Sequence, residues 1–93
     1  MEEFIKYDSG KPMISLVEPR FIEDIAKVLT FGAEKYGIEN WQMCDDPRRY
    51  HDALLRHLIA YAKGEESDSE TNISHLAHAG CCLMFLHYFE DKS

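Results

Sequence analysis

The residues best suited to chemistry in this sequence form an acidic turn followed by two histidines. The stretch EESDSETNISHLAH, residues 65–78, places four carboxylates within six positions and then two histidines three residues apart (Glu65, Glu66, Asp68, Glu70, His75 and His78). On a helix, both imidazoles would share one face near an N-terminus that favours anions. Carboxylates could hold Mg²⁺ or Mn²⁺ beside a phosphate. The alternative is a solvated turn that leads into hydrogen-bonded core histidines.

A second candidate region is the stretch FGAEKYGIENW, residues 31–41. Glu34 is a candidate metal ligand, Lys35 a phosphate contact, and Tyr36 and Trp41 flat surfaces on which a base could stack. Gly32 within a helix costs about 1 kcal/mol relative to Ala, which indicates close approach by another helix or by a ligand. Together these residues are more typical of a nucleotide pocket than of packing.

The third region is RRYHDALLRHLIAYAKGEE, residues 48–66. The Arg56 guanidinium could bind phosphate oxygens with two parallel hydrogen bonds. The alternative is a solvent-exposed pair between Asp52 and Arg56, four residues apart. His57 could add a third ligand if His75 and His78 bound zinc, which is a minor option because the HxxH spacing alone is weak evidence.

Three helices should position these residues. Pro19 and Gly37 bound a first helix at about 19–36, and Asp46, Pro47 and Gly64 bound a second from 47 to about 63. Thr71 or Asn72 could cap a third helix that ends near residue 90. No convincing alternating strand is present, so the fold class is all-α, with residues 1–17 as an extended arm.

The helical spacing of apolar residues predicts which faces are buried. The second helix should bury four side chains (Tyr50, Leu54, Leu58 and Tyr61). The end of the third helix, AGCCLMFLHYF, is apolar on nearly every face, which predicts a central helix or an oligomer seam.

Length, charge and hydropathy limit the possible functions. Ninety-three residues predict a single domain with a modest core, helped by homo-oligomer formation with a shared site. The net charge of −7 and the absence of a basic cluster argue against binding a nucleic-acid polymer. No membrane span or signal peptide is expected, and three cysteines fit a reducing cytoplasm.

The order of four motifs resembles a known family. The motifs are KYDSGKP, VLTFGAEKYGIENW, RRYHDALLRHLIAYAKGE and D-x-E-T-x-x-x-HLAHAGC, over residues 6–90. This order is similar to that of the phage and prophage dATP/dGTP diphosphohydrolases, which are related to the MazG-like all-α nucleoside triphosphate pyrophosphohydrolases.

The resemblance implies an oligomeric helical subunit, acting in the cytoplasm of a bacterial host, that cleaves a purine dNTP to dNMP and pyrophosphate with Mg²⁺ or Mn²⁺. It implies metal binding by Glu34, Glu65, Asp68 and Glu70, with Glu34, Glu70 and His75 in catalysis. For nucleotide binding, the expected residues are Lys35, Tyr36, Trp41, Arg56, His57 and His78.

Acidic residues are fewer here than in MazG-like enzymes. Those enzymes carry EExxE and ExxD motifs, whereas here the second helix offers Asp52 and HxxH stands where ExxD would lie. A second hypothesis is therefore a non-catalytic phage sponge that sequesters a cyclic or other signalling nucleotide of host defence. A third is a structural helical oligomer without a ligand.

Overall fold

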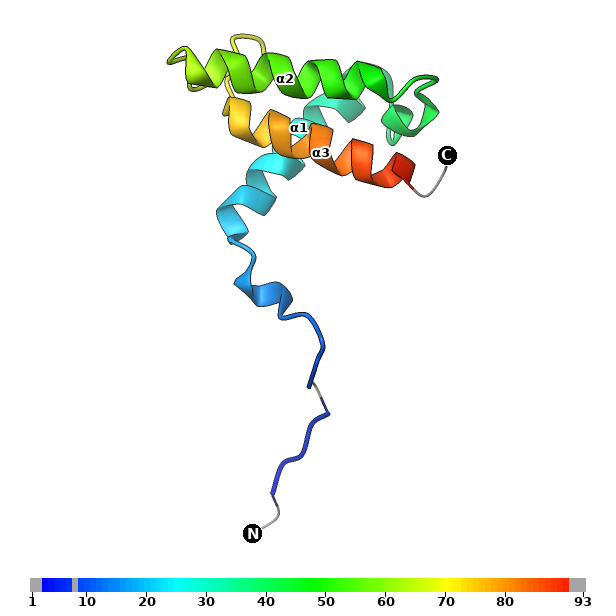
Figure 1. The fold of residues 1–93 in the computed structure, drawn as a ribbon, viewed down its shortest axis with the longest axis vertical. Coiled ribbons are helices and arrows are strands. Elements are labelled where there is room, and N and C mark those ends of the chain that lie inside the picture. The colour runs from blue at the N-terminus through cyan, green and yellow to red at the C-terminus, as the bar shows by residue number, and fades with distance from the viewer. Residues whose placement is uncertain (1–2, 8, 91–93) are drawn as a thin grey trace.

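The computed structural model describes residues 3–7 and 9–90, in which the only long elements are three α-helices. These are α1 (Pro19–Tyr36), α2 (Arg48–Ala62) and α3 (His75–Glu90); short 3₁₀ turns, η1 (Ile14–Leu16) and η2 (Asn40–Met43), precede α1 and α2. Helix α3 packs against both other helices (Figure 1). The described residues contain no strand beyond one isolated bridge, between Ser67 and Ser74. The predicted small all-α bundle is confirmed. Within the described ranges, no helix is long and apolar enough to cross a membrane.

Helix α1 has the predicted bounds, and local hydrogen bonds explain both ends. The Glu18 carboxylate accepts a hydrogen bond from the N–H of Phe21 at 3.1 Å, while Pro19 occupies the first turn. At the other end, Gly37 has a φ of 103° and donates its N–H to the carbonyl of Ala33 at 2.8 Å. A positive φ favours glycine, so the chain turns out of the helix there.

Helix α2 also lies close to its predicted range. The helix begins at Arg48 with Pro47 at the N-cap, one residue later than predicted, and Asp46 Oδ1 accepts the N–H of Arg48 at 3.1 Å. Gly64 follows the helix with a φ of 97°. The predicted burial was only partly right. Leu54 is buried and Tyr50 half-buried, but Leu58 and Tyr61 are 41% and 45% exposed. Because α3 covers only one side of α2, side chains turned away from α3 remain in contact with solvent.

Helix α3 begins later than expected. Ser74 caps it, since Ser74 Oγ accepts the N–H of Leu76 at 3.1 Å, so the prediction of Thr71 or Asn72 as the cap was wrong. Residues 65–74 instead form a closed loop. Hydrogen bonds from Asp68 N to the Ile73 carbonyl at 2.9 Å and from His75 N to the Glu66 carbonyl at 2.9 Å hold it. These backbone bonds keep the chain out of a helix until His75.

The buried face of α3 consists mainly of small side chains. Ala77, Ala79, Cys81 and Cys82 are buried, and Ala79 and Cys82 pack against Leu54 of α2. On the side of α1, a Cβ added to Gly80 would lie 2.8 Å from Phe21 Cζ and 3.2 Å from Ile25 Cδ1. The absence of a side chain at Gly80 therefore permits the close crossing of α1 and α3.

Gly32 has a different environment from Gly80. No atom lies within 4 Å of the position that a Cβ would take at Gly32, so no other helix of the chain approaches it closely. Gly32 instead lines a cavity, and no contact within the described chain requires glycine at this position.

The described residues before α1 form an arm that extends away from the helices (Figure 1). The arm contains η1 and leaves large apolar side chains in solvent; Phe4 is 88% exposed and Tyr7 83% exposed. The chain therefore presents apolar surface well outside its own core.

We expect Gly80→Leu to lower the free energy of unfolding by about 1–3 kcal/mol, because the new side chain would collide with Phe21 and Ile25. Urea denaturation followed by circular dichroism measures this change. His87→Leu, at an exposed position of the same helix, is the matched control and should change stability little. Equal effects of the two substitutions would contradict a tight crossing at Gly80.

Candidate functional site

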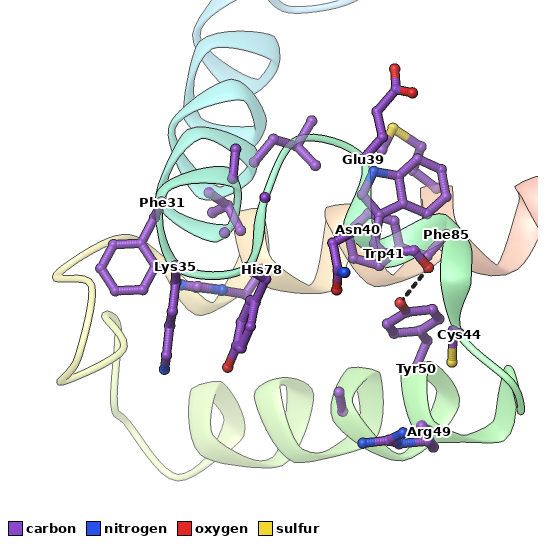
Figure 2. A pocket seen from close by; sticks show the side chains of 18 of the residues that line it. Phe31, Lys35, Glu39, Asn40, Trp41, Cys44, Arg49, Tyr50, His78 and Phe85 are labelled. Atoms are coloured by element: carbon purple, nitrogen blue, oxygen red, sulfur yellow. Dashed lines mark hydrogen bonds between the residues drawn. The ribbon is translucent and has the colours of Figure 1, made fainter.

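An open cavity of about 1600 Å³ lies between the C-terminal half of α1, η2 and residues 49–56 of α2. Figure 2 shows Phe31 and Lys35 on α1, Trp41 on η2, and Arg49 and Tyr50 on α2 around the opening. The α2–α3 loop and α3 complete the wall. Seven residues predicted from the sequence line this one cavity: Glu34, Lys35, Tyr36, Trp41, Arg56, Glu70 and His78.

One wall of the cavity is an aromatic cluster. The Trp41 ring stacks on Phe85, with centroids 4.5 Å apart and planes at 22°, and meets the edge of Tyr88 at 4.9 Å. Tyr50 packs against Phe85 at 4.8 Å and donates its hydroxyl to the Trp41 carbonyl at 2.6 Å. Burial raises the pKa of Tyr50 to about 12, so the hydroxyl keeps its proton. Trp41 is therefore held as part of the wall, and Phe85 occupies one face of its ring.

Tyr36 is the more accessible aromatic surface. Its side chain is 63% exposed at the end of α1, and the neighbouring Lys35 ammonium lies 5.2 Å from the ring centroid. Lys35 Nζ also donates a hydrogen bond to Glu70 Oε2 at 3.1 Å, which raises the pKa of Lys35. The cation beside Tyr36 is thus partly neutralised by an acid from the α2–α3 loop.

Two arginines enter the cavity from α2. Arg49 and Arg56 are seven residues apart, which places them on one face of the helix, and both line the cavity. Arg49 Nη1 lies 3.6 Å from Asp45 Oδ1 in an exposed ion pair. Arg49 was absent from the predicted site, although its spacing from Arg56 indicated it.

Three histidines gather where α2, the loop and α3 meet. His57 stacks on His78, with centroids 4.6 Å apart and planes at 11°, and its Nδ1 lies 2.9 Å from Nδ1 of His75. Burial lowers the pKa of both His57 and His78, so these imidazoles are neutral near pH 7. His78 Nε2 is 2.7 Å from the Thr71 hydroxyl. Of the three histidines, only His78 lines the cavity.

The predicted metal-binding acids are dispersed. Glu34 is exposed at the cavity, Glu70 pairs with Lys35, and Glu65 Oε2 lies 3.8 Å from His75 Nε2. Asp68 Oδ2 accepts the N–H groups of Glu70 and Thr71, both at 3.1 Å. Burial alone would raise the pKa of Asp68, but these hydrogen bonds and the nearby histidines lower it.

Among the described residues, a different set of side chains has ligand atoms close enough together to bind one metal ion. The one group of three possible ligands that converges there is His57, Asp68 and His75, whose ligand atoms lie within 4.8 Å of one another. A site on Glu34, Glu65, Asp68 and Glu70 remains a prediction. Their oxygens do not form the compact cage that Mg²⁺ requires within one chain.

Several lining residues were missed by the sequence analysis. Besides Arg49 they include Phe31, Asn40, Thr71 and Phe85. Phe31 and Asn40 lie in the FGAEKYGIENW motif, so proximity in the sequence indicated them, whereas Phe85 could be located only by the packing of α3.

We expect Tyr50→Phe to lower the free energy of unfolding by about 1 kcal/mol, because the hydrogen bond to the Trp41 carbonyl would be lost. Denaturation followed by the fluorescence of Trp41, the single tryptophan, measures the change at the wall itself. Tyr61→Phe, in an exposed position of α2, is the control. Unchanged stability in Tyr50→Phe would show that this bond does not hold the wall.

Comparison with known proteins gives two matches. The family model described as dATP/dGTP diphosphohydrolase, N-terminal, matches residues 2–93. A protein of Salmonella phage PMBT28 named dATP/dGTP diphosphohydrolase is 45% identical over 82 residues, which cover 88% of this chain and 28% of the phage protein. The chain thus spans less than a third of the length of that relative. No solved structure matches. The family model, which describes the N-terminal region of dATP/dGTP diphosphohydrolases, matches nearly the whole sequence. The chain therefore belongs to the dATP/dGTP diphosphohydrolase family.

Proposed function

We propose that the cavity between α1, η2 and α2 binds a purine nucleotide, with dATP and dGTP as the substrate class. The observation that carries this proposal is the combination of an accessible aromatic ring with three cations around one cavity: Tyr36, Lys35, Arg49 and Arg56. The name of the phage relative supports the choice of ligand.

The side chains suggest how such a ligand would lie. The exposed Tyr36 ring offers a face to the base, and stacking on an aromatic ring suits a purine. The guanidinium groups of Arg49 and Arg56 match phosphate oxygens in geometry. Lys35 is paired with Glu70, so a phosphate that reaches Lys35 must displace this carboxylate.

Hydrolysis of the nucleotide is the first candidate function. Family membership and the name of the relative support cleavage of dATP or dGTP to the monophosphate and pyrophosphate. Lys35 and Arg56 would orient the triphosphate and offset charge on the leaving pyrophosphate. Because the acids of one chain do not fit a Mg²⁺ or Mn²⁺ cage, we derive no metal-dependent step for the isolated subunit.

If two copies of the chain shared a site, their carboxylates together could form the metal site that one chain does not form. The apolar side chains of the arm, including Phe4 and Tyr7, are exposed and suit contact with another subunit. Glu34 is exposed beside the cavity, where it could face such a neighbour. We therefore propose a homo-oligomer, acting in the cytoplasm of a bacterial host, where the three unpaired cysteines would remain reduced.

Nucleotide binding without turnover is the second candidate function, and the acids favour it. Glu70 is neutralised by Lys35, and Asp68 is engaged by the loop backbone, while Arg56 lines the open cavity and Arg49 lies 3.6 Å from Asp45 in an exposed ion pair. This arrangement suits retention of an anion better than activation of water. Such a protein would sequester a cyclic or other signalling nucleotide of host defence.

A turnover assay separates the two candidates. Purified protein is incubated with each dNTP and Mg²⁺ or Mn²⁺, and the products are resolved by chromatography. If the chain is a hydrolase, pyrophosphate should appear with dATP or dGTP and should disappear in the Glu34→Ala, Glu70→Ala double variant. Intact nucleotide recovered after denaturation, with no pyrophosphate, would reject hydrolysis and support sequestration.

Binding itself has a sharper test in single variants. We expect Arg56→Ala and Lys35→Ala each to weaken the binding of dATP about 10- to 100-fold, because each loses a hydrogen bond between charged groups. Isothermal titration calorimetry measures the affinity. Lys27→Ala on α1, whose ammonium pairs with Asp24 outside this cavity, is the matched control. If all three variants bound as tightly as the unchanged protein, the cavity would not be the nucleotide site.

A further inference from the structure

We propose that His57, Asp68 and His75 form a binding site for one divalent transition-metal ion of the Zn²⁺ class, at the junction of α2, the α2–α3 loop and α3. This site shares Asp68 with the acidic magnesium site expected from the sequence, but its other two ligands are histidines and its metal is different. It differs from the zinc option raised there in having Asp68 in place of His78. It does not depend on the proposed nucleotide function.

The three ligands come from three different segments and converge on one point. Nδ1 of His57 and Nδ1 of His75 are 2.9 Å apart, and one ligand atom from each of the three residues lies within 4.8 Å of the others. Two ligands of one tetrahedral zinc ion are separated by roughly 3.4 Å. Side-chain movements of about an ångström would therefore bring all three atoms onto one ion.

The donor atoms select the class of metal. Two imidazole nitrogens and one carboxylate suit zinc and the neighbouring divalent transition metals, whereas Mg²⁺ prefers oxygen ligands and keeps several waters. His75 is buried, with 6% of its surface exposed, and His57 is half-buried. Water is thus largely excluded from the histidine side of the site.

The surroundings of His75 support this assignment. His75 Nε2 is buried without a hydrogen-bond partner among the described residues, and Glu65 Oε2 lies 3.8 Å away. A hydrogen bond between the two Nδ1 atoms explains their short distance but leaves Nε2 unsatisfied. A metal ion on Nδ1 would place a proton on Nε2, directed at Glu65, which is the common arrangement of a carboxylate behind a metal-bound histidine.

Further contacts hold the other two ligands in place. Asp68 Oδ2 accepts the Thr71 N–H at 3.1 Å, and the Thr71 hydroxyl lies 2.7 Å from His78 Nε2. His78 in turn stacks on the His57 ring. Because Asp68 belongs to the loop and the histidines belong to the helices, a bound ion would fasten the loop to both α2 and α3.

The proposal is tested with the full chain, stripped of metal by a chelator, and with Zn²⁺ alone. Calorimetry should show one Zn²⁺ bound per chain and no comparable binding of Mg²⁺. We expect His57→Gln, His75→Gln and Asp68→Asn each to weaken Zn²⁺ binding by more than about 10-fold. Thr71→Val, which removes the hydroxyl in contact with His78 and Ile73 but no proposed ligand, should weaken it by about 10-fold. The controls are His51→Gln on α2 and His87→Gln on α3, both exposed. Loss of affinity in the controls equal to that in the ligand variants would overturn the site.

A measurement on the unchanged protein keeps the test valid if a ligand variant fails to fold. Nuclear magnetic resonance of protein labelled with ¹⁵N in its five histidines reports each imidazole separately. Zn²⁺ should shift the ring signals of His57 and His75 strongly while those of His51 and His87 stay unchanged. Unshifted His57 and His75 signals at saturating Zn²⁺ would reject the proposal.

Discussion

Helix α3 can lie against two other helices because its buried face consists of small side chains. Gly80 leaves room for Phe21 and Ile25 of α1, and the Cys81 thiol donates a weak hydrogen bond to the Ile25 carbonyl at 3.6 Å. Ala79 and Cys82 meet Leu54 of α2 on another side. Close packing depends on shape, so larger residues on this face would separate the helices. The position of α1 relative to α2, and hence the cavity between them, depends on this face of α3.

This packing forms two groups of polar side chains along α2, those of the cavity and those of the histidine cluster. On the cavity side, the end of α1 brings Lys35 opposite the arginines of α2, at the site proposed to bind a nucleotide. One residue beyond Arg56 on α2, His57 meets the loop, which brings Asp68 to His57 and His75 at the proposed transition-metal site. The α2–α3 loop contributes to both regions, since Glu70 pairs with Lys35 while Asp68 lies beside the histidines. The α2–α3 loop is therefore in contact with both the cavity and the histidine cluster.

Capping residues and glycines in the sequence predicted the bounds of α1 and α2 better than the course of the α2–α3 loop. Pro19 and Gly37 bounded α1 correctly because capping involves residues within one turn of each other. The start of α3 was placed too early, since Thr71 and Asn72 have capping side chains in a segment whose backbone is bonded across the loop. The burial of Leu58 and Tyr61 was overestimated for a related reason. Helical spacing reveals an apolar stripe, but the width of the stripe that is covered depends on the neighbouring helix.

The sequence by itself determined the all-α class, two of the three helix starts, and the motifs whose order identifies the family. It also indicated seven of the residues that line the cavity, three of which, Glu34, Lys35 and Tyr36, lie within the single motif GAEKYG. Only the tertiary structure decided which of these residues meet. The Lys35–Glu70 pair spans 35 residues and the His57–His75 contact spans 18, and neither separation carries a periodic signal. Such contacts depend on how α3 packs, and so the expected cluster of acids became a dispersed set of carboxylates, one paired with a lysine and one beside two histidines.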